Sequence, residues 1–82
     1  MSAKNIHFAK WIKLFLKRSQ LSVRQLAILS GLEHASIGQY KRGERLPRNA
    51  SLIYLTKAIS KYEGLAWKDV LFEAIEEIEK DI

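Results

Sequence analysis

Apolar residues recur every three or four positions along almost the whole of this 82-residue chain. No run alternates apolar and polar residues for long enough to predict a strand, and no linker, repeat or low-complexity stretch interrupts the pattern. Spacings of three and four place apolar side chains on one face of an α-helix. The sequence therefore predicts an all-helical protein with a single domain.

Local start and stop signals divide the chain into five predicted helices. Their expected ranges are 5–18, 23–30, 34–42, a fourth capped by Asn49 or Ser51 that ends near Tyr62, and a fifth from Trp67 to the end. Ser22 is a capping residue before the second helix, while Gly31 and Gly43 stand where a left-handed residue ends a helix. Pro47 keeps segment 45–48 out of helical geometry.

Composition excludes several classes of protein. The chain has no cysteine, so it has no disulfide, no cysteine-based metal site and no thiol nucleophile. Its two histidines, His7 and His34, do not stand in a metal-ligand or catalytic pattern, so we expect no enzyme, metal, cofactor or small-molecule substrate. Neither a signal peptide nor a run of eighteen apolar residues is present, which favours a cytoplasmic protein with no membrane contact.

Charge is distributed unevenly along the chain. Residues 1–48 contain ten Lys and Arg but only two acidic residues, Glu33 and Glu44, which gives a net charge of +8. Residues 73–82 contain one Lys and five acidic residues, a net charge of −4. A basic region of this kind attracts a polyanion such as DNA, although excess lysine is also common on solvated surfaces.

The second and third predicted helices are short and are separated by a turn at Gly31. Such a turn needs positive φ, which costs a residue with a side chain about 1 kcal/mol but glycine almost nothing. Ala27 is small enough to let two helices cross closely, and Leu26 and Ile37 supply apolar contacts between them. Two short helices joined in this way, followed by a basic loop, indicate a helix-turn-helix unit.

A longer pattern surrounds this unit. It comprises Leu21-Ser-Val-Arg-Gln-Leu-Ala27, Ser30-Gly31-Leu32, Ser36-Ile37, Arg42-Gly43 and Pro47. With these residues, the region 12–71 resembles the phage-repressor (Xre/Cro-like) helix-turn-helix family of transcriptional regulators. The resemblance implies an all-α, five-helix, lambda-repressor-like fold, with a DNA-binding part in residues 1–66 and a dimerisation helix in 67–82 of the same compact domain.

Some positions depart from the family pattern. Val23 stands where the family usually has Gln, and Leu16 and Lys41 stand where an Arg and a Glu often form a buried pair. Residues 60–63 look like an insertion before Gly64. We expect Leu16 to pack in the core instead.

The resemblance also implies which residues meet double-stranded DNA. The third helix would lie in the major groove, with His34, Ala35, Ser36 and Gln39 towards the bases, and with Ser22, Arg24, Arg42, Arg45 and Arg48 on phosphates. The amide of Gln39 can pair with adenine, and the methyl group of Ala35 can contact a thymine methyl group. Arg45 has the alternative of reaching a base, and Gly38 permits a close approach to the groove.

The last predicted helix is amphipathic. Leu71, Ile75, Ile78 and Ile82 follow helical spacing on one side, and acidic residues occupy the other. Four helices already close a small core, so we expect the fifth to extend past it and to form a homodimer about a two-fold axis. The alternative is that this helix folds back onto its own core.

These observations together predict a dimeric repressor that reads a palindromic operator. Two alternatives keep the fold: a protein-interaction module such as an antitoxin, and a restriction–modification controller protein. A third alternative is membrane-surface binding, because residues 7–18 form a basic amphipathic helix that contains Trp11. The core needs Phe8, Ile12 and Phe15 from this same helix, which favours burial over membrane contact.

Overall fold

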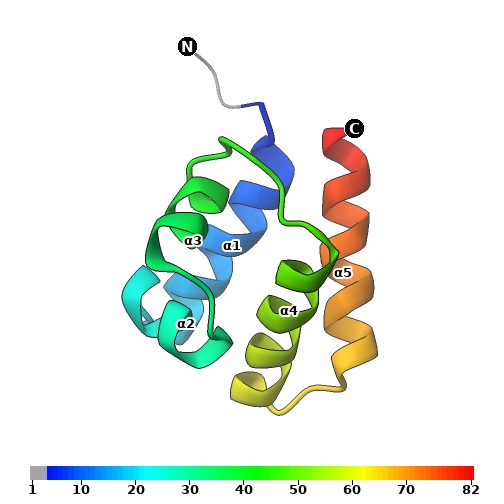
Figure 1. The fold of residues 1–82 in the computed structure, drawn as a ribbon. Coiled ribbons are helices and arrows are strands. Elements are labelled where there is room, and N and C mark those ends of the chain that lie inside the picture. Colours follow the sequence, from blue (N-terminus) through cyan, green and yellow to red (C-terminus); the bar gives the residue numbers. More distant parts are fainter. Residues whose placement is uncertain (1–3) are drawn as a thin grey trace.

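The computed structural model describes residues 4–82, and these residues form five helices and no strand (Figure 1). The helices are α1 (Ile6–Ser19), α2 (Val23–Ser30), α3 (His34–Lys41), α4 (Asn49–Glu63) and α5 (Trp67–Asp81). The expected all-helical class is confirmed, and every expected helix is present with its bounds shifted by no more than three residues. Residues 1–3 of the expected DNA-binding part lie outside the described residues.

Most of the expected helix ends are confirmed. Ser22 is the N-cap of α2, and Gly31, Gly43 and Gly64 all have positive φ, at 74°, 75° and 68°. The expected cap of α4 is wrong: its N-cap is Arg48, which makes no side-chain capping hydrogen bond. The helix begins one residue earlier than an Asn49 cap requires, because the Arg48 carbonyl already accepts the first helical hydrogen bond, from Leu52 N at 2.8 Å.

The core is built around the apolar stripe of α1. Phe8, Ile12 and Phe15 are completely buried, as the core was expected to require, whereas Ile6 and Leu14 of the same helix are about half exposed. The other fully buried large side chains come from α2, α3 and α4 and are Leu26, Ile37, Tyr40, Leu55, Thr56 and Ile59. Leu16 is also buried, as expected. Within residues 4–82 no helix is long and apolar enough to cross a membrane.

The last helix, α5, lies against both α4 and α1, and its end lies beside the start of α1 (Figure 1). Val70 and Ala74 are buried, and Ile78 packs against the core. The expected extension of α5 past the core is therefore not observed. The helix instead runs back along the bundle. Ile78 therefore packs against the core of its own chain, whereas Ile82 stays 94% exposed.

Candidate nucleic-acid interface

The start of α2 is closed by a reciprocal pair of hydrogen bonds. Gln25 N donates to Ser22 Oγ at 3.1 Å, and Ser22 N donates to Gln25 Oε1 at 2.8 Å. This capping box satisfies two backbone groups that the first turn of a helix leaves free. Val23, the departure from the family pattern, is half-buried against the core. The Ser22 hydroxyl, expected at a phosphate, is thus already engaged as a cap.

The turn between α2 and α3 is held from both sides. Gly31 N donates to Ala27 O at 2.9 Å, and its φ of 74° is the left-handed geometry that glycine adopts without strain. The buried Ser30 hydroxyl donates to Leu26 O at 2.8 Å and accepts from Leu32 N at 3.3 Å. No sequence pattern predicted these hydrogen bonds of Ser30, which fix the direction in which α3 follows α2.

One side of α3 is buried and the other is open. Ile37 and Tyr40 are 0% and 1% exposed, and residues opposite them on the helix face outward. His34 and Ala35 are exposed, while Ser36, Gly38 and Gln39 are half-buried. Within residues 4–82 the side chains of His34 and Gln39 have no hydrogen-bond partner. Of the four expected base-reading residues, His34 and Ala35 are therefore exposed, Gln39 is half-buried, and Ser36 is half-buried with its hydroxyl accepting a hydrogen bond from Arg45.

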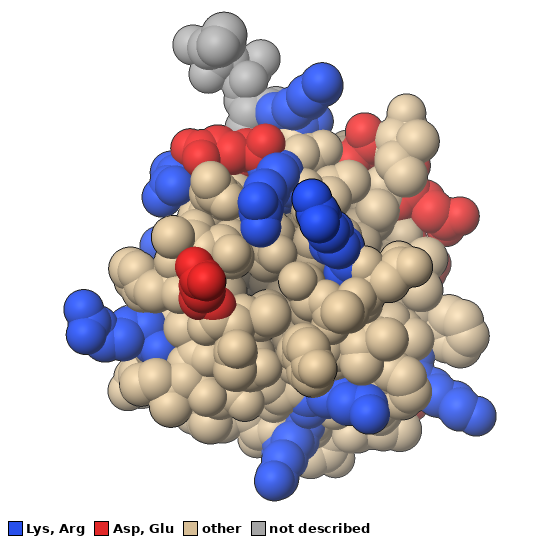
Figure 2. Space-filling model, viewed as in Figure 1, with Lys and Arg blue, Asp and Glu red and all other residues tan. Residues whose placement is uncertain are grey.

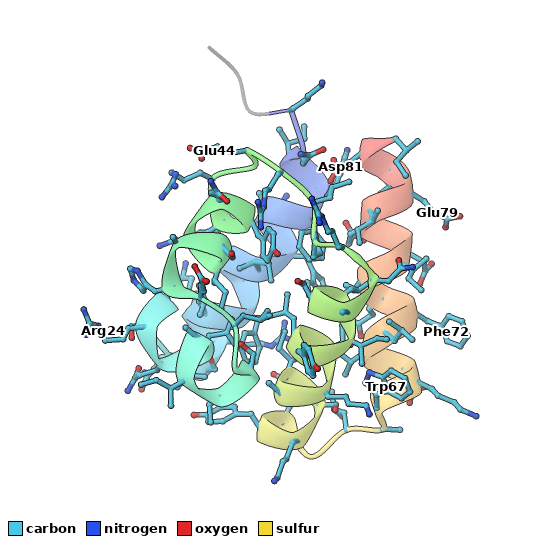
Figure 3. All side chains as sticks on the ribbon, in the orientation of Figure 1. Arg24, Glu44, Trp67, Phe72, Glu79 and Asp81 are labelled. Carbon is cyan, nitrogen blue, oxygen red and sulfur yellow. The ribbon has the colours of Figure 1, made fainter. Side chains whose placement is uncertain are left out.

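The five residues expected at phosphates differ in their surroundings. Arg24 is exposed on α2 and points away from the bundle (Figure 3), and Arg48 is exposed before α4. Neither forms a salt bridge with another described residue. Arg45 folds back onto α3, where Nη2 donates to Ser36 Oγ at 3.4 Å and the guanidinium lies 5.6 Å from the Tyr40 ring centre.

Arg42 is the exception, because a carboxylate holds it. Its Nε donates to Glu44 Oε2 at 2.7 Å and its Nη2 to Oε1 at 3.3 Å. These hydrogen bonds lower the pKa of the Glu44 carboxyl below its ordinary value and raise the pKa of Arg42. No sequence pattern predicted this ion pair.

A hollow of about 470 Å³ lies between α2 and the start of α3. It is lined by Arg24, Ala27, Ile28, Gly31, Leu32 and His34. The hollow thus joins an expected phosphate contact on α2 to an expected base contact on α3. Helical spacing alone could have indicated that Ile28 faces outward, because it lies one turn after Arg24; it is 75% exposed.

The charges around this region are largely basic. Figure 2 shows Lys and Arg side chains along the left and upper edges, where α2, α3 and the following loop lie, with acidic side chains, Glu44 among them, in the same region and further Lys and Arg at the lower edge. Acidic side chains gather over the end of α5 on the right, where Figure 3 labels Glu79 and Asp81. Within residues 4–82 no group of three or more His, Asp or Glu is arranged to hold a metal ion.

Comparison of the chain with protein-family models, curated proteins and solved structures finds no match.

Proposed function

We propose that this protein is a sequence-specific DNA-binding transcriptional regulator with a phage-repressor type of helix-turn-helix, in which α3 enters the major groove. The observation that carries the proposal is the outward side of α3. Its polar side chains, His34 and Gln39, have no partner among the described residues, and two unpaired arginines, Arg24 and Arg48, stand on the segments beside it.

Base recognition would use the small outward surface of α3. The Gln39 amide offers one donor and one acceptor, which match adenine N7 and N6. The methyl group of Ala35 suits a thymine methyl group, and the His34 imidazole can hydrogen-bond a base edge.

Contacts with the phosphates of the DNA backbone would fix the orientation of α3 in the groove. Arg24 and Arg48 are the best placed for phosphates, because no carboxylate among the described residues neutralises them. Each phosphate that a basic side chain neutralises releases counterions, so affinity falls as salt rises. Such contacts carry orientation but no sequence information.

The proposal includes a homodimer, because one recognition helix reads only half of a typical operator. Leu71 and Ile75 are half-buried on α5, and Ile82 is 94% exposed, so all three keep apolar surface for a second copy. A two-fold axis would set the two α3 helices about 34 Å apart, which is one turn of DNA. The dimer is then expected to bind a palindromic operator and to repress transcription from it.

Selection from a pool of random duplexes tests the proposal. We expect one enriched motif, bound with a log affinity that falls steeply against log salt concentration. Gln39→Ala should relax the preference at one base pair by about 1–3 kcal/mol. Arg24→Ala should weaken binding to all sequences, whereas Lys68→Ala, which removes the same charge from α5, should weaken it much less.

The outcome against the proposal is equally definite. A pool that stays random after selection, with weak binding that ignores sequence, would contradict a sequence-specific regulator.

A specific observation favours one second candidate, a protein-interaction module of the antitoxin kind. Ile28, Leu29 and Tyr62 are 75%, 49% and 48% exposed. Leu29 and Tyr62 also share two neighbouring hollows of about 250 and 240 Å³ between α2 and α4. Apolar surface of this kind is typical of protein contacts. A random pool after selection would promote this candidate.

A further inference from the structure

The centre of the outward face of α3 is occupied by a side chain that begins at the end of the helix. Arg42 follows Ala35 by seven residues, about two helical turns, so both lie on the same side, opposite Ile37 and Tyr40. Side chains on a helix lean towards its N-terminus, and Arg42 accordingly folds back over Gly38, four residues earlier. A Cβ atom at Gly38 would lie only 3.1 Å from Arg42 Nη1.

The backbone at the end of α3 fixes the carboxylate that holds Arg42. Gly43 N donates to Tyr40 O at 3.1 Å, and Glu44 N donates to Gln39 O at 2.9 Å. These two bonds, with positive φ at Gly43, form the glycine-based helix end known as a Schellman motif. Asn5 N further anchors the turn by donating to Gly43 O at 3.2 Å. Glu44 therefore lies beside Arg42 because the chain turns there.

The paired Arg42 keeps an unused edge. A guanidinium has five N–H donors, and Glu44 takes one on Nε and one on Nη2. Three donors are left over, two on Nη1 and one on Nη2, and one from each nitrogen points in parallel along the end of the guanidinium. Guanine presents two acceptors, N7 and O6, to the same kind of paired donor in the major groove.

The carboxylate also selects between two kinds of ligand. A phosphate carries negative charge and would be repelled by Glu44, which makes Arg42 a poor phosphate anchor. A base edge is uncharged, so an arginine that is already paired can still bind it. We propose that Arg42 reads a guanine in the major groove, with Glu44 as the positioning residue and Gly38 as the gap that admits the guanidinium.

This inference rests on the proposed function, and base preference measured with full-length variants tests it. The wild-type protein should require guanine at one position of each half-site. Arg42→Lys keeps the charge but loses the paired donors, so it should lose that preference by roughly 5- to 150-fold while its affinity for random DNA stays similar. Gly38→Ala should weaken the same preference by a smaller factor, because a Cβ atom 3.1 Å from Arg42 Nη1 makes the guanidinium shift slightly.

Glu44→Gln gives the sharpest readout, because two effects have opposite signs. Removing a negative charge at the interface should strengthen binding to random DNA. Loss of the positioning carboxylate should at the same time weaken the guanine preference. The matched control is Glu33→Gln, which removes the other carboxylate of this region; the Glu33 side chain makes no capping hydrogen bond. This control should raise affinity for all sequences and leave the preference unchanged.

Two results would overturn the inference while leaving the proposed function intact. One is a selected motif whose guanine preference survives Arg42→Lys. The other is a Glu44→Gln variant that, like Glu33→Gln, binds all sequences more tightly with an unaltered preference, which would make Glu44 a charge screen only. A wild-type protein that selects no motif would instead remove the proposed function itself.

Discussion

The contact between the two ends of the chain gives the most quantitative prediction. The carboxylate of Asp81, at the end of α5, accepts hydrogen bonds from the first backbone N–H groups of α1. Oδ1 accepts from His7 N at 2.9 Å, and Oδ2 accepts from Phe8 N at 2.8 Å. The N-cap of α1, Asn5, makes no side-chain capping hydrogen bond, and the first turn of α1 has no acidic residue. Asp81 therefore caps α1 from 74 residues away.

The expected magnitude follows from these two bonds. Loss of a helix cap costs about 0.5–2 kcal/mol, and loss of a negative charge at a helix N-terminus costs about 0.3–1 kcal/mol. The two contributions overlap, so we expect Asp81→Ala to lower the free energy of unfolding by about 1–2.5 kcal/mol. In a domain of this size that lowers Tm by roughly 5–15 °C. Asp81→Asn keeps one acceptor oxygen and should lose about half as much.

Urea and thermal unfolding followed by far-UV circular dichroism measure this difference. Glu79→Ala is the matched control, because Glu79 carries the same charge on the same helix and points away from the bundle (Figure 3). The control should change the free energy of unfolding by less than about 0.5 kcal/mol. Equal stabilities of Asp81→Ala and Glu79→Ala would refute the reasoning, because the end of α5 would then not cap α1.

Three further substitutions test separate contacts. Gly31→Ala should destabilise the protein by about 1 kcal/mol or more in the same unfolding assay, because alanine is strained at a φ of 74°. Thr56→Val should cost about 1–2 kcal/mol, since the indole Nε1 of Trp67 donates to Thr56 Oγ1 at 2.9 Å. Hydrogen bonding from Arg18 lowers the pKa of Glu63, so its stabilisation is present above the ordinary glutamate pKa of about 4.3 and is lost as the pH falls below it. Glu63→Gln should therefore be less stable than wild type at pH 7, by about 0.2–1 kcal/mol, and equally stable near pH 2; a difference that persists at pH 2 would contradict this origin.

Local chemistry made much of the fold predictable. The bounds of α2 follow directly from Ser22, which satisfies free N–H groups at its start, and from Gly31, which tolerates the left-handed geometry at its end. Gly43 ended α3 in the same way. Burial of the α1 stripe was also predictable, because a short chain has few other large apolar residues with which to build a core.

Contacts between distant segments were harder to predict from the sequence. The amphipathic pattern of α5 indicates that one stripe is buried, but it does not say whether the protein's own core or a second copy buries it. The structure places Ile78 against the core because α5 runs back along α1 and α4. No sequence pattern predicted that Asp81 caps α1, since its partners are backbone N–H groups of a helix at the other end of the chain.

The candidate interface was likewise predictable only in part. The family resemblance implied that His34, Ala35 and Gln39 are the outward residues of α3, and these three are exposed or half-buried. It did not foresee that Glu44 pairs with Arg42, because that contact depends on the direction of the chain after Gly43. Pairwise geometry of this kind arises only once the helix end is built in three dimensions.

The most direct test of the central claim is to map, by NMR, which backbone amides shift when the ¹⁵N-labelled protein binds its selected duplex. The account predicts large shifts from the start of α2 through α3 to Arg48, and small shifts along α5 away from any surface shared between copies. Shifts centred on α5 or on the exposed side of α1, with α3 unaffected, would contradict it.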